Sequence, residues 1–224
     1  MESTGILVET MSRIAPVVWK SLMRRGGVAL SIRMPQDLSL DRIPGLHPGA
    51  KAPDFKLPGI DGKTHTLSSF QDRPILVVFF SCNHCPYVQA WESRFVEVQR
   101  DYEARGVQLV AINSNDETKY PEDDFAHMKN RAKAKGYNFP YLRDGSQQTA
   151  EAYGPVSTPD FYVLDKDRVI RYRGRMDDNH ADPEKVTKRH LRDALDDLLA
   201  GKAVRTPLTP PYGCSIKWKP GHYA

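Results

Sequence analysis

Apolar runs long enough to cross a membrane and a full set of paired cysteines are both missing from this chain of 224 residues. No stretch of about 18 consecutive apolar residues occurs, so we expect no transmembrane segment. Three cysteines are too few, and an odd number, for a disulfide scaffold. We therefore expect the protein to work in an intracellular, reducing compartment.

The middle of the chain also lacks the basic excess that nucleic-acid binding requires. Residues 51–201 hold 22 Lys and Arg against 24 Asp and Glu, whereas residues 11–34 and 202–224 carry basic residues and no acidic ones. A slightly acidic body excludes nucleic acid as a partner. Internal repeats and low-complexity tracts are absent as well. We assign a basic extension to residues 1–49, one globular domain to residues 50–201, and a tail that packs on the domain to residues 202–224.

Strand and helix patterns alternate in the centre of the domain. Residues 74–81, "PILVVFFS", form a continuous apolar run, which is typical of a central strand covered on both faces. From Val88 to Tyr102 apolar residues recur every three or four positions, and Gly106 follows, which predicts an amphipathic helix. Residues 107–113 return to strand character, so the three elements form a βαβ unit.

A second helix and a hairpin are expected next. Pro121 suits a first helical turn and Gly136 suits a helix end, so a helix is predicted over residues 121–135. The segments "DFYVLD" at 160–165 and "RVIRYRG" at 168–174 are typical of two strands joined by a turn.

The final helix is predicted from its cap and its apolar stripe. Asp182 suits the cap, Pro183 the first position and Gly201 the end of the helix. The stripe consists of Val186, Leu191, Leu195, Leu198 and Leu199. The predicted order of elements is therefore βαβ, α, ββ, α.

Cys82 and Cys85 are separated by two residues and lie between the predicted apolar strand and the predicted helix. A zinc site needs four ligands, and neither Cys214 nor His180 supplies a second paired spacing, so no metal is expected. A permanent disulfide across two residues closes a very small loop and stabilises little. Two buried core thiols are the plainest alternative to a redox pair.

A redox role has a positive physical argument. If the helix begins near Cys82, the thiolate of Cys82 faces free backbone N–H groups and the positive end of the helix dipole, which lower its pKa. His84 acts in the same direction if it is protonated or donates a hydrogen bond. Cys82 is then the attacking thiolate and Cys85 the resolving thiol. Pro86 falls in the first turn, where a missing N–H does no harm.

Several segments together carry a resemblance to a known family. They are "APDFKLPGIDGKTHTLSSF" (52–70), "CNHCPYV" (82–88), "VAINSND" (110–116), "FPYLRD" (139–144), "STPDFYVLD" (157–165), "YRGRMDDN" (172–179) and "GCSIKWK" (213–219). Over roughly residues 50–219 the chain resembles the thioredoxin superfamily, and within it the peroxiredoxin-like thiol–disulfide isomerase group of the redoxins (AhpC/TSA). The resemblance implies an α/β thioredoxin fold, a central mixed sheet flanked by helices, with the extension and the tail outside it.

The same resemblance implies an activity and a set of site residues. The activity is that of a thiol–disulfide oxidoreductase without a cofactor, whose partners are protein disulfides and dithiols. Thioredoxin-fold proteins place a cis proline opposite the CxxC motif, and Pro159 is the candidate; the alternative is an ordinary turn proline. The backbone beside that proline pairs with an extended substrate, so Thr158 is assigned to substrate binding, together with Asn83 and Pro86.

Two other functions stay open. True peroxiredoxins carry Thr or Ser three residues before the reactive cysteine and Pro seven residues before it. In this chain the corresponding positions before Cys85 are Cys82 and Val78. Thiol peroxidase activity is therefore the second choice. The third is an accessory thioredoxin-like subunit that residues 1–45 dock into a larger assembly, such as a mitochondrial membrane complex. The expected location is accordingly a bacterial-type cytoplasm or a mitochondrion.

Two further positions are interpreted more plainly. Asn115 and Asp116 follow a strand end; lining the site is one interpretation, and ordinary loop residues are the expected one. Cys214 is expected to be a bystander, unless the tail folds back and makes it an electron relay.

Overall fold

The computed structural model describes residues 40–221 of the chain. The predicted N-terminal extension, and the docking role assigned to residues 1–45, therefore lie largely outside the described residues. None of the helices within residues 40–221 is long and apolar enough to span a membrane.

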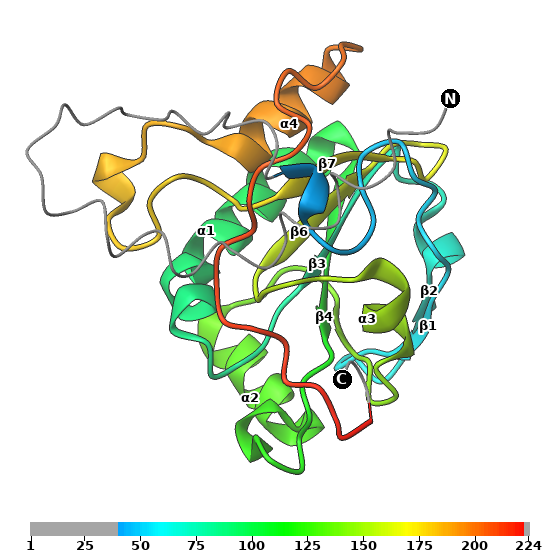
Figure 1. The fold of residues 1–224 in the computed structure, drawn as a ribbon, viewed down its shortest axis with the longest axis vertical. Helices are drawn as coiled ribbons and strands as arrows, with labels where there is room; N and C mark the ends of the chain where they lie inside the picture. Colours follow the sequence, from blue (N-terminus) through cyan, green and yellow to red (C-terminus); the bar gives the residue numbers. More distant parts are fainter. Residues whose placement is uncertain (1–39, 222–224) are drawn as a thin grey trace, which may run out of the picture. The chain divides into compact units, whose positions relative to one another are not determined.

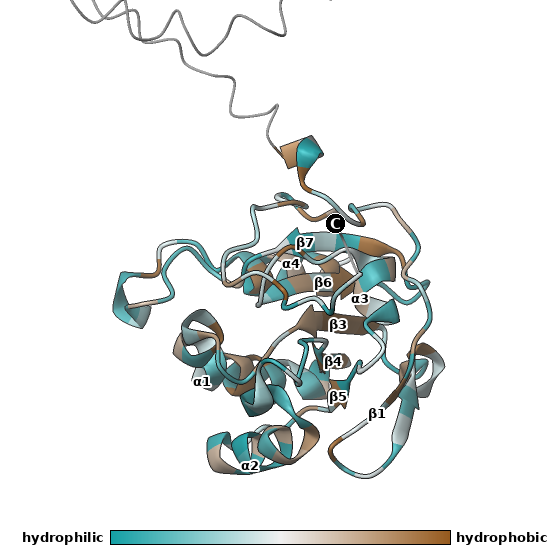
Figure 2. Cartoon of the chain, turned by 60° about the horizontal axis from the view of Figure 1, so that its bottom comes forward, coloured by the Kyte–Doolittle hydropathy of each residue, from teal (hydrophilic) through white to brown (hydrophobic). Residues whose placement is uncertain are grey.

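A five-stranded mixed sheet forms the centre of the described domain (Figure 1), and Figure 2 labels its strands in the order β5-β4-β3-β6-β7. The strands are β3 (Ile75–Phe80), β4 (Val107–Asn113), β5 (Tyr141–Arg143), β6 (Asp160–Leu164) and β7 (Ile170–Gly174). Strand β3 pairs in parallel with β4 and antiparallel with β6, and β6 pairs antiparallel with β7. A separate hairpin joins β1 (Lys56–Pro58) to β2 (Thr64–Thr66). The helices are α1 (Pro86–Tyr102), α2 (Phe125–Lys135), α3 (Gln148–Tyr153) and α4 (His190–Leu199).

Strand β3 separates two apolar cores, which is why its sequence is apolar without a break. Val77 and Phe79 point into a core shared with α1, α2 and α4, whereas Val78 and Phe80 point into a core shared with α3 and the β1–β2 hairpin. Every residue of β3 is buried, and the strand is drawn brown at the centre of Figure 2. The fold thus has three layers: α1, α2 and α4 on one side, the five-stranded sheet in the middle, and α3 with the β1–β2 hairpin on the other side.

The predicted strands, the central helix and the hairpin are all confirmed. Helix α1 continues into a 3₁₀ turn, and Gly106 ends it with a left-handed backbone (φ 87°). Strands β5, β1 and β2, each of three residues, and the six-residue helix α3 were not predicted, because such short elements give no periodic pattern.

The second predicted helix begins later than expected. Its first part, Pro121–Asp123, is a separate 3₁₀ turn, and α2 begins at Phe125. Asp124 causes the break because its backbone is extended and its side chain accepts the N–H of His127. This break turns Asp123 toward the carboxyl ends of the parallel strands.

The last predicted helix also begins later. Asp182 and Pro183 start only a 3₁₀ turn, Pro183–Lys185, and α4 begins at His190. The backbone N–H of Thr187 donates to Asp178 at 2.9 Å, which holds the intervening segment away from helical geometry.

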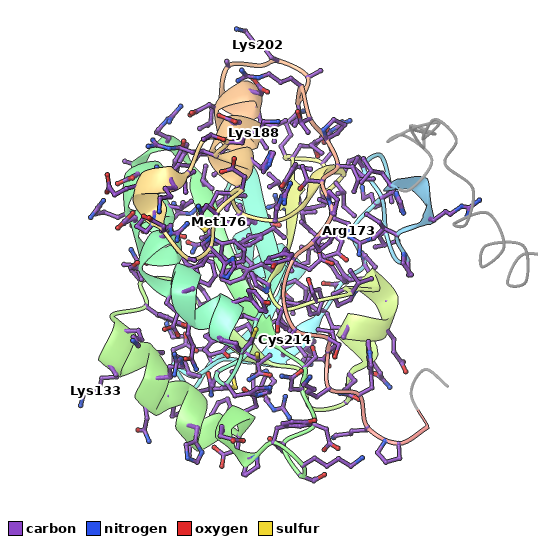
Figure 3. All side chains as sticks on the ribbon, turned by 60° about the vertical axis from the view of Figure 1, so that its left-hand side comes forward. Lys133, Arg173, Met176, Lys188, Lys202 and Cys214 are labelled. Atoms are coloured by element: carbon purple, nitrogen blue, oxygen red, sulfur yellow. The ribbon has the colours of Figure 1, made fainter. Side chains whose placement is uncertain are left out.

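One buried arginine ties together segments that are distant in sequence. The guanidinium of Arg173, on β7, donates to the carbonyl oxygens of Pro44 (2.7 Å), Leu46 (3.1 Å) and Gly154 (3.0 Å). It also pairs with the Asp160 carboxylate at 3.0 Å, and both side chains are fully buried. Arg173 is labelled in Figure 3, beside the segment that precedes the β1–β2 hairpin.

We predict that Arg173→Met lowers the free energy of unfolding by about 3–5 kcal/mol, because the buried Asp160 carboxylate loses its ionic partner. The matched control is Arg171→Met on the same strand, whose side chain is 46% exposed and pairs with Asp165 at the surface. The control substitution should lower the free energy of unfolding by only about 0–1 kcal/mol. Urea unfolding followed by circular dichroism measures both values, and equal losses would contradict the structural role of Arg173.

Candidate active site

The two CxxC cysteines lie in the loop between the carboxyl end of β3 and the start of α1. Helix α1 begins at Pro86, and Cys85 is its N-cap with an extended backbone (φ −69°, ψ 121°). The expectation that the helix begins near Cys82 is therefore corrected. The residue before a proline avoids the helical region, so the helix cannot include Cys85.

Both thiols are free, buried, and pressed against the peptide that precedes Pro159. Cys82 is 1% exposed and Cys85 is 0% exposed. The sulfur of Cys82 lies 3.3 Å from the hydroxyl of Thr158, and the thiol of Cys85 lies 3.2 Å from the carbonyl oxygen of Thr158. The Thr158–Pro159 peptide is cis, as predicted. The structure thus brings together Cys82, Cys85, Thr158 and Pro159.

The contacts of the reduced pair shift the two thiol pKa values in opposite directions. A hydrogen bond from Cys82 lowers the pKa of Cys85 to about 4 despite burial, and contacts from Cys214 and the N–H of Val88 act in the same direction. The same thiol–thiol bond, burial and the charge of Asp123 raise the pKa of Cys82 well above its usual value. The expected low pKa at Cys82 is therefore corrected: the helix start stabilises a thiolate at Cys85 instead.

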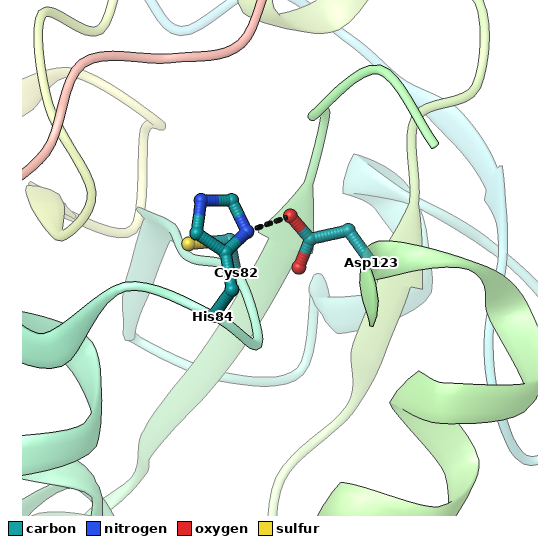
Figure 4. Close-up of side chains that lie close together, drawn as sticks. All are labelled: Cys82, His84 and Asp123. Carbon is teal, nitrogen blue, oxygen red and sulfur yellow. Dashed lines mark hydrogen bonds and ion pairs between the residues drawn. The ribbon is translucent and has the colours of Figure 1, made fainter. Parts of the chain in front are cut away.

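A histidine–aspartate pair stands beside Cys82 (Figure 4). The Nδ1 atom of His84 lies 2.7 Å from a carboxylate oxygen of Asp123, which is completely buried. A carboxylate only accepts hydrogen bonds, so Nδ1 carries the proton and Nε2 is free to accept another. The ring of His84 stacks on Tyr120 with centroids 5.0 Å apart. Asp123 was missed because the sequence pattern placed it inside a helix.

Asp123 also organises the surrounding loops. It accepts the backbone N–H of Asn83 at 2.6 Å and the side-chain amide of Asn115 at 2.8 Å. Asn115, expected to be an ordinary loop residue, is thus buried next to the site. The side chain of Asn83 bonds to the carbonyl of Glu122 and to the hydroxyl of Tyr141, so it holds the loop in shape. Its contact with a substrate stays a prediction.

Within residues 40–221, Cys82, His84 and Asp123 form a group that offers donors to a metal ion. Their sulfur, nitrogen and oxygen atoms lie within 4.8 Å of one another. Zinc accepts all three donor types. The Asp123 carboxylate, however, already accepts hydrogen bonds from Asn83, Asn115 and His84, so metal binding requires it to give up existing partners.

The fold and the site define a class. A mixed sheet with a βαβ unit, a hairpin introduced by a cis proline, and a thiol pair facing that proline make this a thioredoxin-fold protein of the redoxin type. The model of the AhpC/TSA family matches residues 48–173, and the chain belongs to that family. The predicted fold class and family are confirmed.

Solved and curated relatives agree with this placement. A hypothetical protein from Sinorhizobium meliloti 1021 is 41% identical with a TM-score of 0.75, covering 80% of this chain and 98% of that one. Peroxiredoxin Q of Oryza sativa is 27% identical over 66% of this chain and 64% of its own length. The thiol-disulfide oxidoreductase ResA of Geobacillus thermodenitrificans is 26% identical over 55% of this chain and 66% of its own length. The matches thus span slightly less than two thirds of these two curated proteins.

We predict that Asp123→Asn lowers the pKa of Cys82, because it removes the negative charge beside that thiol and keeps the shape of the side chain. The pH dependence of alkylation, measured in a chain with Cys85→Ser and Cys214→Ser, reports the Cys82 thiol alone. Asp124→Asn is the control one residue away, since the half-buried Asp124 bonds to His127 rather than to the site. An unchanged pKa of Cys82 in Asp123→Asn would show that the carboxylate has no influence on it.

Proposed function

We propose that the protein is a thiol–disulfide oxidoreductase that exchanges disulfides with protein substrates through Cys82 and Cys85. The observation that carries this proposal is the contact of both free thiols with Thr158, directly before the cis proline. One thiolate and one thiol in contact form the reduced state from which a disulfide is made. The similarity to ResA, named a thiol-disulfide oxidoreductase, supports the same chemistry.

In the proposed reaction Cys82 attacks first. Its raised pKa keeps it protonated at rest, so the attack requires a base, and His84 is the base because Asp123 holds its ring in place. The Cys82 sulfur bonds to one sulfur of the substrate disulfide, the substrate S–S bond breaks, and the leaving thiolate takes the proton from His84.

Cys85 completes the exchange. Its thiolate attacks the Cys82 sulfur of the mixed disulfide, which forms the Cys82–Cys85 bond and releases the second substrate thiolate. In the mixed disulfide Cys82 has no thiol proton left to donate, so the backbone N–H of Val88 at the start of α1 is a contact that still stabilises the Cys85 thiolate. Two electrons pass from the cysteine pair to the substrate disulfide. Thr158 supplies backbone for an extended substrate, and Pro86, which is exposed at the start of α1, is a further proposed contact.

Thiol peroxidase activity is the second candidate, favoured by the low pKa of Cys85 at the start of α1. In that reaction the Cys85 thiolate attacks one oxygen of hydrogen peroxide, the O–O bond breaks, hydroxide leaves, and Cys85 becomes a sulfenic acid. The Cys82 thiol then attacks the Cys85 sulfur and forms the disulfide with loss of water. The similarity to peroxiredoxin Q supports it. One observation counts against it. True peroxiredoxins carry Thr or Ser three residues before the reactive cysteine and Pro seven before it, whereas this chain has Cys82 and Val78 there.

We predict that Cys85→Ser accumulates a mixed disulfide on Cys82 when mixed with two peptides joined by one disulfide. Cys82→Ser should not, and both variants also carry Cys214→Ser so that no third thiol intervenes. Intact-mass spectrometry detects the adduct. An adduct only on Cys85 would reverse the order of attack, and no adduct in either variant would contradict disulfide exchange.

The two candidate functions predict different rates of oxidation by hydrogen peroxide. If exchange is the function, hydrogen peroxide should oxidise the reduced wild-type protein no faster than free cysteine with the same thiolate fraction. Stopped-flow oxidation measures that rate, and a much faster reaction that is lost in Cys85→Ser would favour the peroxidase.

We predict that His84→Ala slows adduct formation in the Cys85→Ser chain by about 10²–10⁴ at neutral pH, because general-base assistance is lost. The defect should disappear as the pH rises above the pKa of Cys82, where the thiolate forms without help. The control is His127→Ala, which removes an exposed histidine that pairs with Asp124 in the same way. A defect that is independent of pH would indicate that His84 acts only on the loop structure.

A further inference from the structure

The C-terminal tail lies across the thiol pair. Cys214 forms an isolated antiparallel bridge with Thr158, and the backbone N–H of Thr158 donates to the carbonyl oxygen of Cys214 at 2.8 Å. Figure 3 labels Cys214 close to other sulfur atoms in the centre of the molecule. The tail therefore pairs with the residue before the cis proline, which is the backbone that the proposed function reserves for an extended substrate.

The tail fits this place closely. A Cβ atom added to Gly213 would lie 2.0 Å from the carbonyl oxygen of Thr158, so only glycine allows the approach. Farther along, the backbone N–H of Asp116 donates to the carbonyl of Lys217 at 2.8 Å, and the N–H of Lys217 donates to Asn115 at 2.8 Å. The side chain of Ile216 is buried in the core between these contacts. The segment is thus held like an added strand.

The sulfur atoms complete the arrangement. The thiol of Cys214 is hydrogen-bonded to Cys85, which is also bonded to Cys82, so Cys85 is the middle member of three cysteines in contact. Burial and the Cys85 thiolate raise the pKa of Cys214 to about 11, so Cys214 is the proton donor in its contact with Cys85. The tail thus presents a thiol on an extended backbone next to Cys85, the resolving sulfur of the pair.

We propose that residues 213–216 occupy the substrate groove as an internal substrate and that Cys214 is a third exchangeable thiol. The inference rests on the proposed function, which supplies the oxidised Cys82–Cys85 pair. The Cys214 thiol loses its proton and attacks the sulfur of Cys85, the Cys82–Cys85 bond breaks, and the Cys85–Cys214 bond forms. Cys82 leaves as a thiolate and takes the proton, so the step transfers no net electrons.

The tail also indicates which substrates the groove accepts. A protein substrate should present its cysteine in an extended segment, with glycine directly before it, because the Thr158 carbonyl leaves no room for a Cβ atom at the position of Gly213. An apolar residue two places after the cysteine can take the position of Ile216. Since both catalytic thiols are buried while the tail is docked, such a substrate has to displace the tail before it reacts.

The first test uses Cys82→Ser and oxidised glutathione. Cys85 should form a glutathione adduct, and Cys214 should then displace the glutathione to give a Cys85–Cys214 disulfide, seen as a cross-linked peptide by mass spectrometry. Adding Cys214→Ser should leave the adduct in place, whereas adding Ser215→Ala, a change at the next exposed residue, should not. A stable glutathione adduct in Cys82→Ser itself would overturn the inference.

This result is separable from the proposed function. If wild-type protein forms the Cys82–Cys85 disulfide while Cys82→Ser forms no Cys85–Cys214 bond, only the role of the tail fails. If wild-type protein forms no Cys82–Cys85 disulfide with a disulfide substrate, the proposed function itself fails.

The second test loosens the tail. Gly213→Ala should speed alkylation of Cys82 and Cys85 in the reduced protein by about tenfold or more, because local opening exposes them. Gly145→Ala is the control, since a Cβ atom there meets no neighbour within 4 Å. Circular dichroism verifies that both variants are folded, and equal alkylation rates in the two would refute the covering role of the tail.

Discussion

The hydrogen bond between the two buried thiols is the interaction on which the site depends. It divides one proton and one negative charge between Cys82 and Cys85, and the surroundings decide which sulfur holds which. Proline at the first position of α1 makes Cys85 the N-cap, where the charge is stabilised. The carboxylate of Asp123 disfavours a second negative charge at Cys82. In the proposed reaction Cys82 attacks a substrate disulfide once it loses its proton, and Cys85 then closes the Cys82–Cys85 bond as the substrate accepts two electrons.

The sheet brings these groups together because β3 and β4 are parallel neighbours. Their carboxyl ends meet at one edge, so the loop that carries Cys82 comes to lie beside the segment that follows Asn113. The 3₁₀ turn before α2 adds Asp123 at the same edge, and the antiparallel strand β6 adds Thr158 and Pro159 from the other side. Four segments that are far apart in sequence thus form a single site.

The tail changes how this site should behave. Because it is part of the same chain, it binds at a high effective concentration and does not need strong contacts to stay docked. A substrate that competes with it has to supply a better fit or a reactive disulfide. The same backbone group of Thr158 cannot pair with both at once, so docking of the tail and binding of a substrate exclude each other.

The sequence by itself determined the apolar central strand, the helix after it and the CxxC pair, because these depend on local periodicity and on a motif of a few residues. The cis proline was predicted from the family resemblance and is confirmed. The sequence did not place Asp123 at the site, and it predicted a lowered pKa at Cys82, whereas the contacts of the structure lower the pKa of Cys85. Only the tertiary structure decided these points, together with the position of Cys214. The physical reason is that a pKa and a contact depend on groups that are close in space, and the breaks before α2 and the fold of the tail set those distances.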